Sequence, residues 1–161
     1  MGGRFDLVRR LATAPVALAL VLMLLLASSG LVWWRGLPPD SSAPSAVARE
    51  EAENFFTLHH ESVQDDVDKV LALAVGDFKS EYAARREEIV KHVRARKLEV
   101  AATIPENGVA VEYLSESEAR ILVAVDVSSR SEDGVEDQRF RCRLTLRKVD
   151  DSWLVAELEQ V

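Results

Sequence analysis

Side chains of the types that bind metal ions gather in one short stretch, residues 59–66, which reads HHESVQDD. Histidine and carboxylate side chains are common ligands of zinc and similar ions. His59 and His60 are adjacent, however, and adjacent side chains on a helix point about 100° apart, so the two cannot readily bind one ion. On a helix, His59 and Asp66 lie about two turns apart, too far for a single site without a third element. The pattern therefore predicts a capped junction between helices on a wet surface, and we expect no metal ion there.

A carboxylate and a tyrosine in one pocket could transfer protons, and Tyr82, Tyr113 and Asp126 are the only candidates for such an acid–base site. Asp126 lies between Val125 and Val127, so strand alternation points it away from the apolar face. The sequence leaves open which face of this strand lines a pocket. No arrangement of Ser, His or Cys supplies a nucleophile. We therefore expect a domain without catalytic residues and without a cofactor.

Cys142 is the single cysteine of the chain, so no disulfide can form within it. It alternates with Phe140 and Leu144, which places all three on one face of a predicted strand. Free cysteine behaves as a small buried hydrophobe, and the pattern therefore predicts a thiol in the core. A disulfide to another molecule is the alternative outside the cell.

The other face of the same predicted strand carries a set of arginines that we call the arginine stripe: Arg139, Arg141, Arg143 and Arg147. In one interpretation the stripe is a solvated face that pairs with carboxylates on a neighbouring strand, such as Glu157 or Glu159. In the other interpretation it is a docking surface for an acidic partner or for lipid headgroups.

The elements that position these residues follow an apolar segment, 11–34, which reads LATAPVALALVLMLLLASSGLVWW and carries no charge. As a helix it would be about 36 Å long, enough to cross a hydrocarbon core of about 30 Å. Trp33 and Trp34 suit the membrane–water interface. Three arginines precede the segment and only Arg35 follows it closely. The positive-inside rule therefore predicts a single membrane span, with a cytoplasmic tail (1–10) and an extracytoplasmic remainder.

A cleavable signal peptide is the alternative, since Ala27, Ser28 and Ser29 could form a small-residue cleavage site. The apolar run continues past that point, whereas the core of a signal peptide is usually about 7–15 residues long, so we expect an uncleaved anchor. Residues 35–45 are rich in proline and serine and predict a short linker. The remaining residues, 46–161, then form one extracytoplasmic domain.

The part of the chain that follows the apolar segment is strongly acidic. Residues 36–161 contain 16 of the 20 Lys and Arg and 26 of the 27 Asp and Glu, a net charge of −10. Nucleic acid and anionic lipid surfaces are both bound by basic patches on a protein. The negative net charge of this part of the chain therefore argues against nucleic-acid binding and against a polybasic reader of the membrane surface. The acidity is typical of a solvated domain.

Within the domain, the period of the apolar residues changes from about 3.6 to 2 near residue 97. The first part predicts helices over 46–58, 62–74 and 77–93, with Ser62 and Asp65 as a capping box and Gly76 as a stop signal. The second part predicts strands over 97–104, 109–113, 121–127, 139–147 and 153–159. Asn107-Gly108 is typical of a type I′ hairpin turn, and residues 131–137 are expected to form a loop. Helices first and an antiparallel meander afterwards predict an α+β domain whose helices pack on one face of the sheet.

Three segments resemble the actinobacterial Mce-associated membrane proteins, which are small single-span proteins linked to the Mce (mammalian cell entry) lipid-import systems. They read FFTLHHESVQDDVDKVLALAVGDFKSEYAARREEIV, VEYLSESEARILVAVDV and WLVAELEQV, and the resemblance covers residues 48–161. It implies a cone-shaped domain of the nuclear transport factor two-like or cystatin-like kind, with three helices packed on a curved antiparallel sheet of four to five strands. It also implies a role as an accessory or stabilising subunit of an Mce transporter. His59 and His60 depart from the family pattern, which is more acidic and aromatic at this point.

We therefore expect a single-pass membrane protein whose extracytoplasmic domain acts by association with Mce transporter subunits. A lipid- or sterol-binding module is the first alternative, with a hydrophobic pocket lined by residues such as Phe55, Phe56, Tyr82, Val123 and Asp126. An enzyme of the isomerase or dehydratase kind, which cone-shaped folds also include, is the less favoured alternative.

Overall fold

The structure, a computed structural model, describes residues 39–131 and 134–161. The expected cytoplasmic tail, the expected membrane span and the first residues of the expected linker lie outside these ranges. Within them, no helix is both long and apolar enough to cross a membrane.

The described residues form four helices where three were expected: α2 (Ser42–Phe56), α3 (Val63–Leu73), α4 (Gly76–Ala84) and α5 (Arg86–Ala95). The third expected helix, 77–93, is divided at Arg85, whose N–H donates to the carbonyl oxygen of Tyr82 at 3.1 Å. This bond closes a turn tighter than that of an α-helix. The helix α4 therefore ends at Ala84, and α5 begins at Arg86. Gly76 has a φ of +67°, which agrees with its predicted role as a break between helices.

The helix α2 begins inside the expected linker, at Ser42 rather than at residue 46. Pro44 does not prevent this, because it falls in the first turn, where a backbone N–H would have no partner within the helix. The carboxylate of Asp40 accepts hydrogen bonds from the backbone N–H and the hydroxyl of Ser42, at 2.9 and 2.6 Å. The predicted linker therefore extends too far into the domain.

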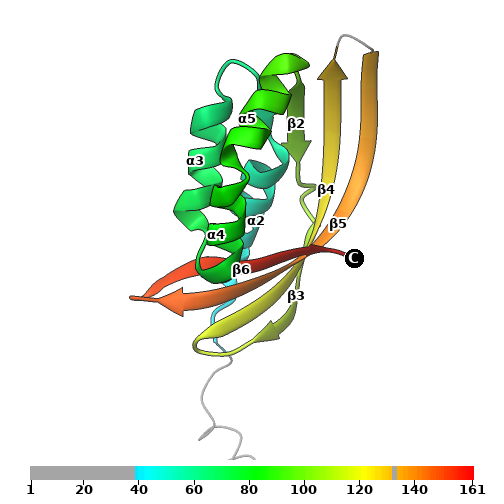
Figure 1. The fold of residues 1–161 in the computed structure, drawn as a ribbon. Helices are drawn as coiled ribbons and strands as arrows, with labels where there is room; N and C mark the ends of the chain where they lie inside the picture. The colour runs from blue at the N-terminus through cyan, green and yellow to red at the C-terminus, as the bar shows by residue number, and fades with distance from the viewer. Residues whose placement is uncertain (1–38, 132–133) are drawn as a thin grey trace, which may run out of the picture. The chain divides into compact units, whose positions relative to one another are not determined.

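The strands form one sheet, in the order β1-β2-β4-β5-β6, with β3 also paired with β4. All the strand pairs are antiparallel. The bounds are β1 (Leu58–His59), β2 (Glu99–Thr103), β3 (Val109–Leu114), β4 (Glu118–Ser131), β5 (Gly134–Val149) and β6 (Ser152–Gln160). The sheet curves around the helices, so that β3 and β6 cross the lower part of the domain while β4 and β5 rise beside the helices (Figure 1). This arrangement confirms the predicted α+β class with a curved antiparallel sheet.

The predicted hairpin at Asn107-Gly108 is wrong. The strand β2 pairs with residues 126–130 of β4, and β3 pairs with residues 119–123 of the same strand. The two short strands therefore follow one another in the same direction along one edge of β4, which is long enough to accommodate both. Gly108 has no positive φ; a Cβ at this position would lie 3.1 Å from the carbonyl oxygen of Ala124. A larger residue would crowd the backbone of β4 here, so the glycine favours the close approach of two backbones and does not serve a reversal of the chain.

Arg49 of α2 holds the connection between β2 and β3. Its guanidinium donates to the carbonyl oxygens of Ile104 and Pro105, at 3.0 and 3.3 Å. The helix is thereby joined to the edge of the sheet at the point where the edge changes from β2 to β3.

The hairpin of β4 and β5 is longer than predicted. Most of the expected loop, 131–137, continues the two strands, whose pairing extends to Ser131 and Gly134. Two consecutive positive φ values, which a type I′ turn needs, occur instead between β5 and β6, where Asp150 and Asp151 have φ values of +48° and +64°. Aspartate tolerates this conformation better than most residues.

The core lies between α2 and the inner face of the sheet, and α2 contacts every strand from β2 to β6. Ala48 and Ala52 are fully buried, and their small side chains allow the helix to approach the strands closely. They pack with inward-facing residues of the central strands, among them Ile121, Val123, Val125, Cys142, Leu144, Leu146 and Val155. A second cluster, formed by Val63, Val67 and Val93, joins α3 to α5.

Candidate binding groove

Five aromatic rings are linked by a series of contacts: Phe55 and Phe56 of α2, Phe78 and Tyr82 of α4, and Phe140 of β5. The centroid of the Phe55 ring lies 5.1 Å from that of Phe56 and 5.7 Å from that of Tyr82. Phe56 stacks on Phe140, with centroids 5.2 Å apart and an interplanar angle of 18°. The end of α2 is therefore connected by aromatic contacts both to α4 and to the sheet.

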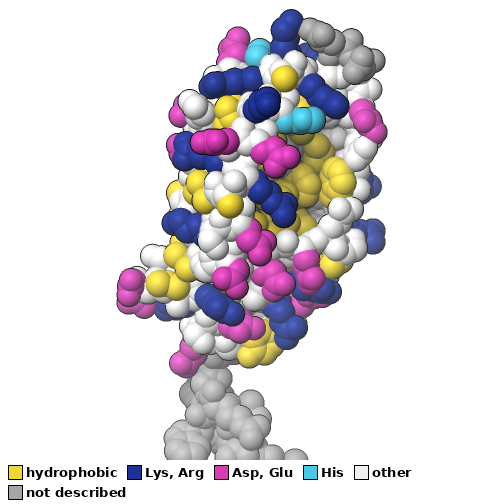
Figure 2. Space-filling model, in the orientation of Figure 1, with side chains coloured by type: hydrophobic (Ala, Val, Ile, Leu, Met, Phe, Trp, Pro, Cys, Tyr) yellow, Lys and Arg dark blue, Asp and Glu magenta, His cyan; other side chains and the backbone are white. Residues whose placement is uncertain are grey.

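An open groove of about 300 Å³ lies between the end of α2 and the strands β2, β4 and β5. We call it the aromatic groove, and its lining residues are Phe55, Phe56, Leu58, Val100, Val127, Ser129, Glu136, Gln138 and Phe140. Figure 2 shows a hollow with a hydrophobic floor in this region, between the helices and the rising strands, with charged side chains around it. Its volume is at the lower end of the range typical of ligand sites, about 300–1,000 Å³.

Local structure explains why the groove stays open. The helix α2 ends at Phe56, and the backbone N–H of Ala102 donates to the hydroxyl of Thr57 at 3.3 Å, which holds the helix end against β2. Beyond this point β4 and β5 continue while α2 does not. Phe55, Phe56 and Phe140 consequently remain only half buried.

The structure brings together three of the five residues that were expected to line a pocket. Phe55 and Phe56 line the aromatic groove, and Tyr82 contacts Phe55. Val123 is 1% exposed and belongs to the closed core. Asp126 points to the opposite face of the sheet, where it lines a separate hollow.

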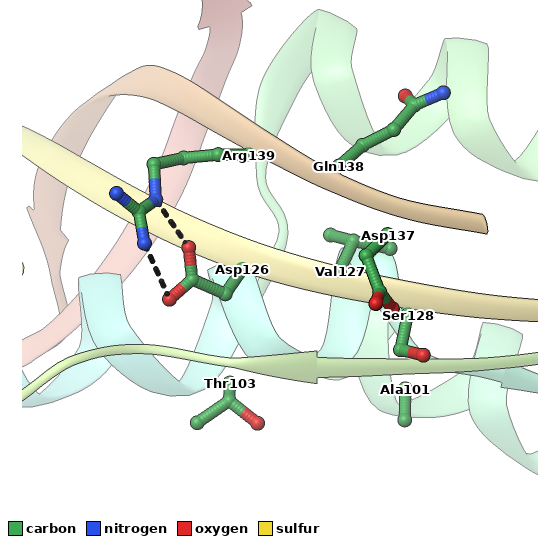
Figure 3. Close-up of a pocket in the computed structure, with 8 residues that line it drawn as sticks. All are labelled: Ala101, Thr103, Asp126, Val127, Ser128, Asp137, Gln138 and Arg139. Atoms are coloured by element: carbon green, nitrogen blue, oxygen red, sulfur yellow. Dashed lines mark hydrogen bonds and ion pairs between the residues drawn. The ribbon is translucent and has the colours of Figure 1, made fainter.

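Asp126 is paired with Arg139 of the neighbouring strand, and the two side chains point toward each other across the outer face (Figure 3). The hydrogen bond from Arg139, with its Nε 2.5 Å from Oδ1, and the guanidinium charge hold the pKa of Asp126 below its usual value. A carboxyl group kept ionised in this way is a poor proton donor. Tyr82 lies among the aromatic rings, and Tyr113 lies on β3 with the guanidinium of Arg120 5.0 Å from its ring centroid. The structure thus does not join the three acid–base candidates in one site.

The arginine stripe lies on the outer face of β5, as strand alternation predicts. Arg143 is held by two carboxylates, with nitrogen–oxygen distances of 2.6 Å to Glu112 of β3 and 2.7 Å to Glu159 of β6. The expected pairing with Glu159 is therefore present, whereas Glu157 lies opposite Thr145. The hydrogen bond from Arg143 also lowers the pKa of Glu112.

Two members of the stripe are thus already neutralised, Arg139 by Asp126 and Arg143 by two carboxylates. Arg141 and Arg147 are exposed and form no ion pair with another described residue. A docking surface for an acidic partner would therefore have two free cations to offer rather than four.

Replacing Arg143 with methionine should lower the free energy of unfolding by about 1 kcal/mol, because one partly exposed side chain joins three strands through two ion pairs of about 0.2–1 kcal/mol each. Chemical denaturation at pH 7 and low salt measures the change. Arg141→Met, on the same strand face but without an ion pair, is the matched control and should change stability less. Equal losses in the two variants would show that the ion pairs contribute nothing.

Residues 59–66 form a network around a buried carboxylate. Asp66 is 3% exposed and lies 3.3 Å from Nδ1 of His59, so the predicted separation of these residues is wrong. The reason is that His59 belongs to β1 and not to a helix, and the chain turns back between β1 and α3. Asp66 also accepts hydrogen bonds from the backbone N–H of His59, the hydroxyl of Ser62 and the ammonium of Lys69, at 3.0, 3.2 and 3.0 Å. Ser62 therefore bonds to Asp66, and the capping box predicted with Asp65 does not form.

Burial alone would raise the pKa of Asp66, but hydrogen bonds from Lys69 and His59 outweigh it and lower the pKa. The carboxylate is thus ionised at neutral pH. His60 has a different partner, since its Nδ1 lies 2.5 Å from a carboxylate oxygen of Glu99. Across the part of the chain that the structure describes, no three His, Cys, Asp or Glu side chains are grouped so that they could hold a metal ion.

Glu51 of α2 is fully buried, and neither of its carboxylate oxygens has a hydrogen-bond partner among the described residues. Burial, with a smaller contribution from the charge of Glu50, raises the pKa of Glu51 to about 9, so the carboxyl group is protonated at neutral pH. Burial also raises the pKa of Tyr82 to about 12, with smaller contributions from the carboxylates of Glu51 and Asp66, both of which are ionised at the high pH where a phenol titrates.

Two residues of this region were missed in the sequence. Glu51 follows Ala48 by three positions and precedes Phe55 by four, a spacing that puts it on the apolar face of α2 and could have revealed its burial. Phe140 was assigned to the inner face of its strand but not to a pocket. Its place in the groove depends on where α2 ends.

Cys142 is fully buried on the inner face, as predicted, and burial raises the pKa of its thiol to about 11. A pKa of about 11, against 9.0 for an ordinary thiol, implies about 100-fold less thiolate at neutral pH than in the unfolded chain. The native protein should therefore react with an aromatic disulfide reagent at least 100-fold more slowly than the chain in urea, as followed by absorbance. Arg141→Cys, an exposed cysteine on the same strand, should react rapidly in the folded state. Similar rates for Cys142 in the two states would contradict its burial.

The fold is similar to that of several solved bacterial domains, two of which belong to type IV secretion systems. An IcmL-like type IV secretion system protein from Legionella pneumophila subsp. pneumophila str. Philadelphia 1 matches with a TM-score of 0.64 and 13% identity, over 78% of this chain and 94% of that chain. The periplasmic domain of DotI matches with a TM-score of 0.64 and 14% identity, over 78% and 98%. CagV, a VirB8 homolog from Helicobacter pylori strain 26695, matches with a TM-score of 0.59 and 10% identity, over 75% and 98%. At these identities the similarity concerns the fold alone.

A relative is found by sequence in Mycobacterium tuberculosis (strain ATCC 25618 / H37Rv), the uncharacterized protein Rv1363c, which is 24% identical over 160 residues. The match covers 94% of this chain but 60% of the relative, so the chain spans about three-fifths of that protein's length. The sequence profile of the family described as "Uncharacterized protein Rv1363c/MT1408-like" matches residues 10–161. The chain therefore belongs to the Rv1363c/MT1408-like family.

Proposed function

We propose that residues 39–161 form an extracytoplasmic accessory domain that acts by binding another protein, in a chain that residues 11–34 anchor in the membrane. The similarity in fold to the periplasmic domain of DotI supports a location outside the cytoplasm. The net charge of the chain, −7, supports a surface exposed to solvent rather than to nucleic acid. We assign no catalytic residue, because Tyr82, Tyr113 and Asp126 each have separate partners.

The aromatic groove is the observation that carries this proposal. Its floor contains three half-buried phenylalanine rings, Phe55, Phe56 and Phe140, in an open hollow. Aromatic side chains in a concave surface can bury a large area of a partner at a small entropic cost, and such residues often dominate the energy of protein interfaces. The arginine stripe is the less favoured contact surface, because Arg139 and Arg143 are already paired within the domain.

The partner that we propose is a subunit of an Mce-type lipid transporter. The support for this choice is the resemblance of residues 48–161 to the Mce-associated membrane proteins. In this role the domain stabilises or assembles the transporter, and the apolar groove receives a hydrophobic segment of the partner subunit.

Affinity purification of the tagged full-length protein from its native membrane in mild detergent tests the proposal, with mass spectrometry of the proteins recovered. Ser129 lines the aromatic groove, whereas its neighbour Ser128 is exposed on the outer face. Ser129→Glu places a charge in the groove, and Ser128→Glu is the matched control on the opposite face of the same strand. Both variants are compared by thermal unfolding so that loss of binding is not confused with loss of fold.

The proposal expects Mce subunits to be recovered with the natural sequence and with Ser128→Glu, and to be reduced at least tenfold with Ser129→Glu. Arg141→Glu, a reversal at a free member of the arginine stripe, should leave recovery unchanged. If the Ser129→Glu protein still recovered Mce subunits, the contact with those subunits would lie outside the aromatic groove. Absence of Mce subunits from every preparation would refute the proposed partner.

Binding of a lipid or sterol is the second candidate, and the apolar floor of the groove favours it. Native mass spectrometry of the purified full-length protein distinguishes the two functions. A bound lipid that is displaced in Ser129→Trp, where the larger side chain fills the groove, would support the lipid-binding candidate. Protein free of lipid would count against it.

A further inference from the structure

The described residues that line the aromatic groove include a single charged side chain, the carboxylate of Glu136 on β5. Ser129 and Gln138 add neutral polar groups, and the remaining lining residues are aromatic or aliphatic. Lysine and arginine are absent from this lining. The groove therefore combines an apolar floor with one negative group.

Glu136 has no cationic partner among the described residues of the domain. Its Oε1 accepts a hydrogen bond from the amide Nε2 of Gln138 at 2.5 Å, and this neutral donor orients the carboxylate without compensating its charge. On the outer face of the same hairpin, by contrast, Asp126 is paired with Arg139. The inner face thus presents a negative charge that the described part of the fold does not neutralise.

The register of the sheet places Glu136 at one end of a row of side chains that crosses the groove. Glu136 lies opposite Ser129, Ser129 opposite Val100, and Val100 opposite Leu58. Neighbouring strands are about 4.8 Å apart, so Val100 and Glu136 are about 10 Å apart along this row. Val100 is half buried and Glu136 is exposed, so the row leads from an apolar floor to a charged rim. A long side chain with an apolar stem and a charged head is complementary to such a row.

We propose that the aromatic groove receives a lysine or arginine side chain of the hydrophobic partner segment, with the apolar stem on the floor and the cationic head at Glu136. This inference rests on the proposed function and specifies the chemistry of the segment that the groove accepts. The faces of aromatic rings attract cations, and Phe55, Phe56 and Phe140 line the same groove. Residues 36–161 carry 26 acidic and 16 basic side chains, a balance that favours the approach of a basic segment.

A basic residue in the partner is compatible with the loss of binding expected for Ser129→Glu. Ser129 is half buried on the floor, where the apolar part of the segment would cover an added carboxylate and remove its water. The added carboxylate would also lie directly opposite Glu136, and like charges at opposite positions are destabilising. Glu136 itself is exposed at the rim and keeps part of its hydration.

Charge reversal at two adjacent positions of β5 tests the inference in the affinity purification described above. Glu136→Lys reverses the charge in the groove. Asp137→Lys makes the same change at an exposed position of the outer hollow and is the matched control. The side chains of Asp137 and Gln138 point away from each other, as strand alternation requires (Figure 3). Thermal unfolding of both variants separates loss of binding from loss of fold.

Recovery of Mce subunits should fall at least tenfold with Glu136→Lys and stay unchanged with Asp137→Lys. Loss of recovery with Ser129→Glu but not with Glu136→Lys would overturn the charged contact and leave the proposed function standing. Recovery that resists both substitutions in the groove would contradict the groove as the contact surface, and this inference with it. Equal losses with Glu136→Lys and Asp137→Lys would also overturn the inference, because the effect would then follow from net charge alone.

A small-molecule measurement tests the preference for cations without the partner. Phenylguanidinium and benzoate each carry one aromatic ring, with opposite charges. Their binding to the full-length protein in neutral detergent is followed by the broadening of their aromatic proton NMR signals. Phenylguanidinium should bind at least fivefold more tightly than benzoate, and this preference should be lost in Glu136→Gln but kept in Asp137→Asn. Equal binding of the two compounds to the natural protein, or a preference that survives Glu136→Gln, would overturn the inference even if no Mce subunit were recovered.

Discussion

Replacing Glu51 with glutamine should raise the free energy of unfolding by about 3 kcal/mol at pH 7. The ordinary pKa of a glutamate is 4.5, whereas burial raises that of Glu51 to about 9 in the folded protein. Between these values folding requires the uptake of a proton, so the contribution of this group to stability is fully present below about pH 4.5 and is lost as the pH rises toward 9. Glutamine has nearly the same shape and takes up no proton.

Urea denaturation between pH 5 and pH 9 measures this effect. The natural protein and Glu51→Gln should have similar stabilities near pH 5, and the difference should grow by about 1.4 kcal/mol for each pH unit up to about pH 9. Glu50→Gln, at the exposed neighbouring position on the same helix, is the control and should show no such growth. A difference between Glu51→Gln and the natural protein that does not vary with pH would mean that the buried carboxyl group is not protonated in the folded state.

The substitution Asp66→Asn should have the opposite effect and lower the free energy of unfolding by about 2 kcal/mol at pH 7. The carboxylate accepts hydrogen bonds from His59, Ser62 and Lys69. An amide of the same size has one acceptor oxygen, and its NH₂ group would face at least one of these donors. The loss of stability should be larger than that caused by the same substitution at an exposed aspartate, because the site around Asp66 is closed to water.

Acid titration supplies a further check on Asp66. Its pKa is lowered in the folded state, so its stabilising contribution is present above the ordinary aspartate value of 3.8 and is lost as the pH falls through the lower, folded-state value. The difference between Asp66→Asn and the natural protein should therefore shrink below about pH 4. Asp65→Asn, one residue away and exposed, should be nearly neutral at every pH. A loss of stability in Asp65→Asn equal to that in Asp66→Asn would refute the role of the network.

The helices and strands could be predicted from the sequence because their apolar periods are clear. The alternation in Phe140, Cys142, Leu144 and Leu146 fixes which face of β5 is buried, and all four side chains face inward in the structure. Pairing was harder to predict. Asn107-Gly108 has the composition of a hairpin turn, but the length of β4 allows β2 and β3 to share one of its edges, and no local pattern contains this information.

The candidate site was only partly predictable for the same reason. Phe55 and Phe56 could be assigned to an apolar face, but the groove exists because α2 ends at Phe56 while β4 and β5 continue. The ion pair between Asp126 and Arg139 depends on the register of β4 and β5, which the sequence did not specify. Asp66 was seen as a helix-junction residue, and its contact with His59 required the turn between β1 and α3.

The packing of α2 against the strands also determines when this domain can fold. α2 stands at the start of the described chain, whereas the strands that cover its buried alanines, Ala48 and Ala52, come much later, and β6 comes last. A helix of this length is only marginally stable alone, and contacts between distant parts of a chain form slowly. We therefore expect a chain that ends before β6 to remain open and sensitive to protease, with the phenylalanines of α2 exposed to chaperones until the final strand has been synthesised.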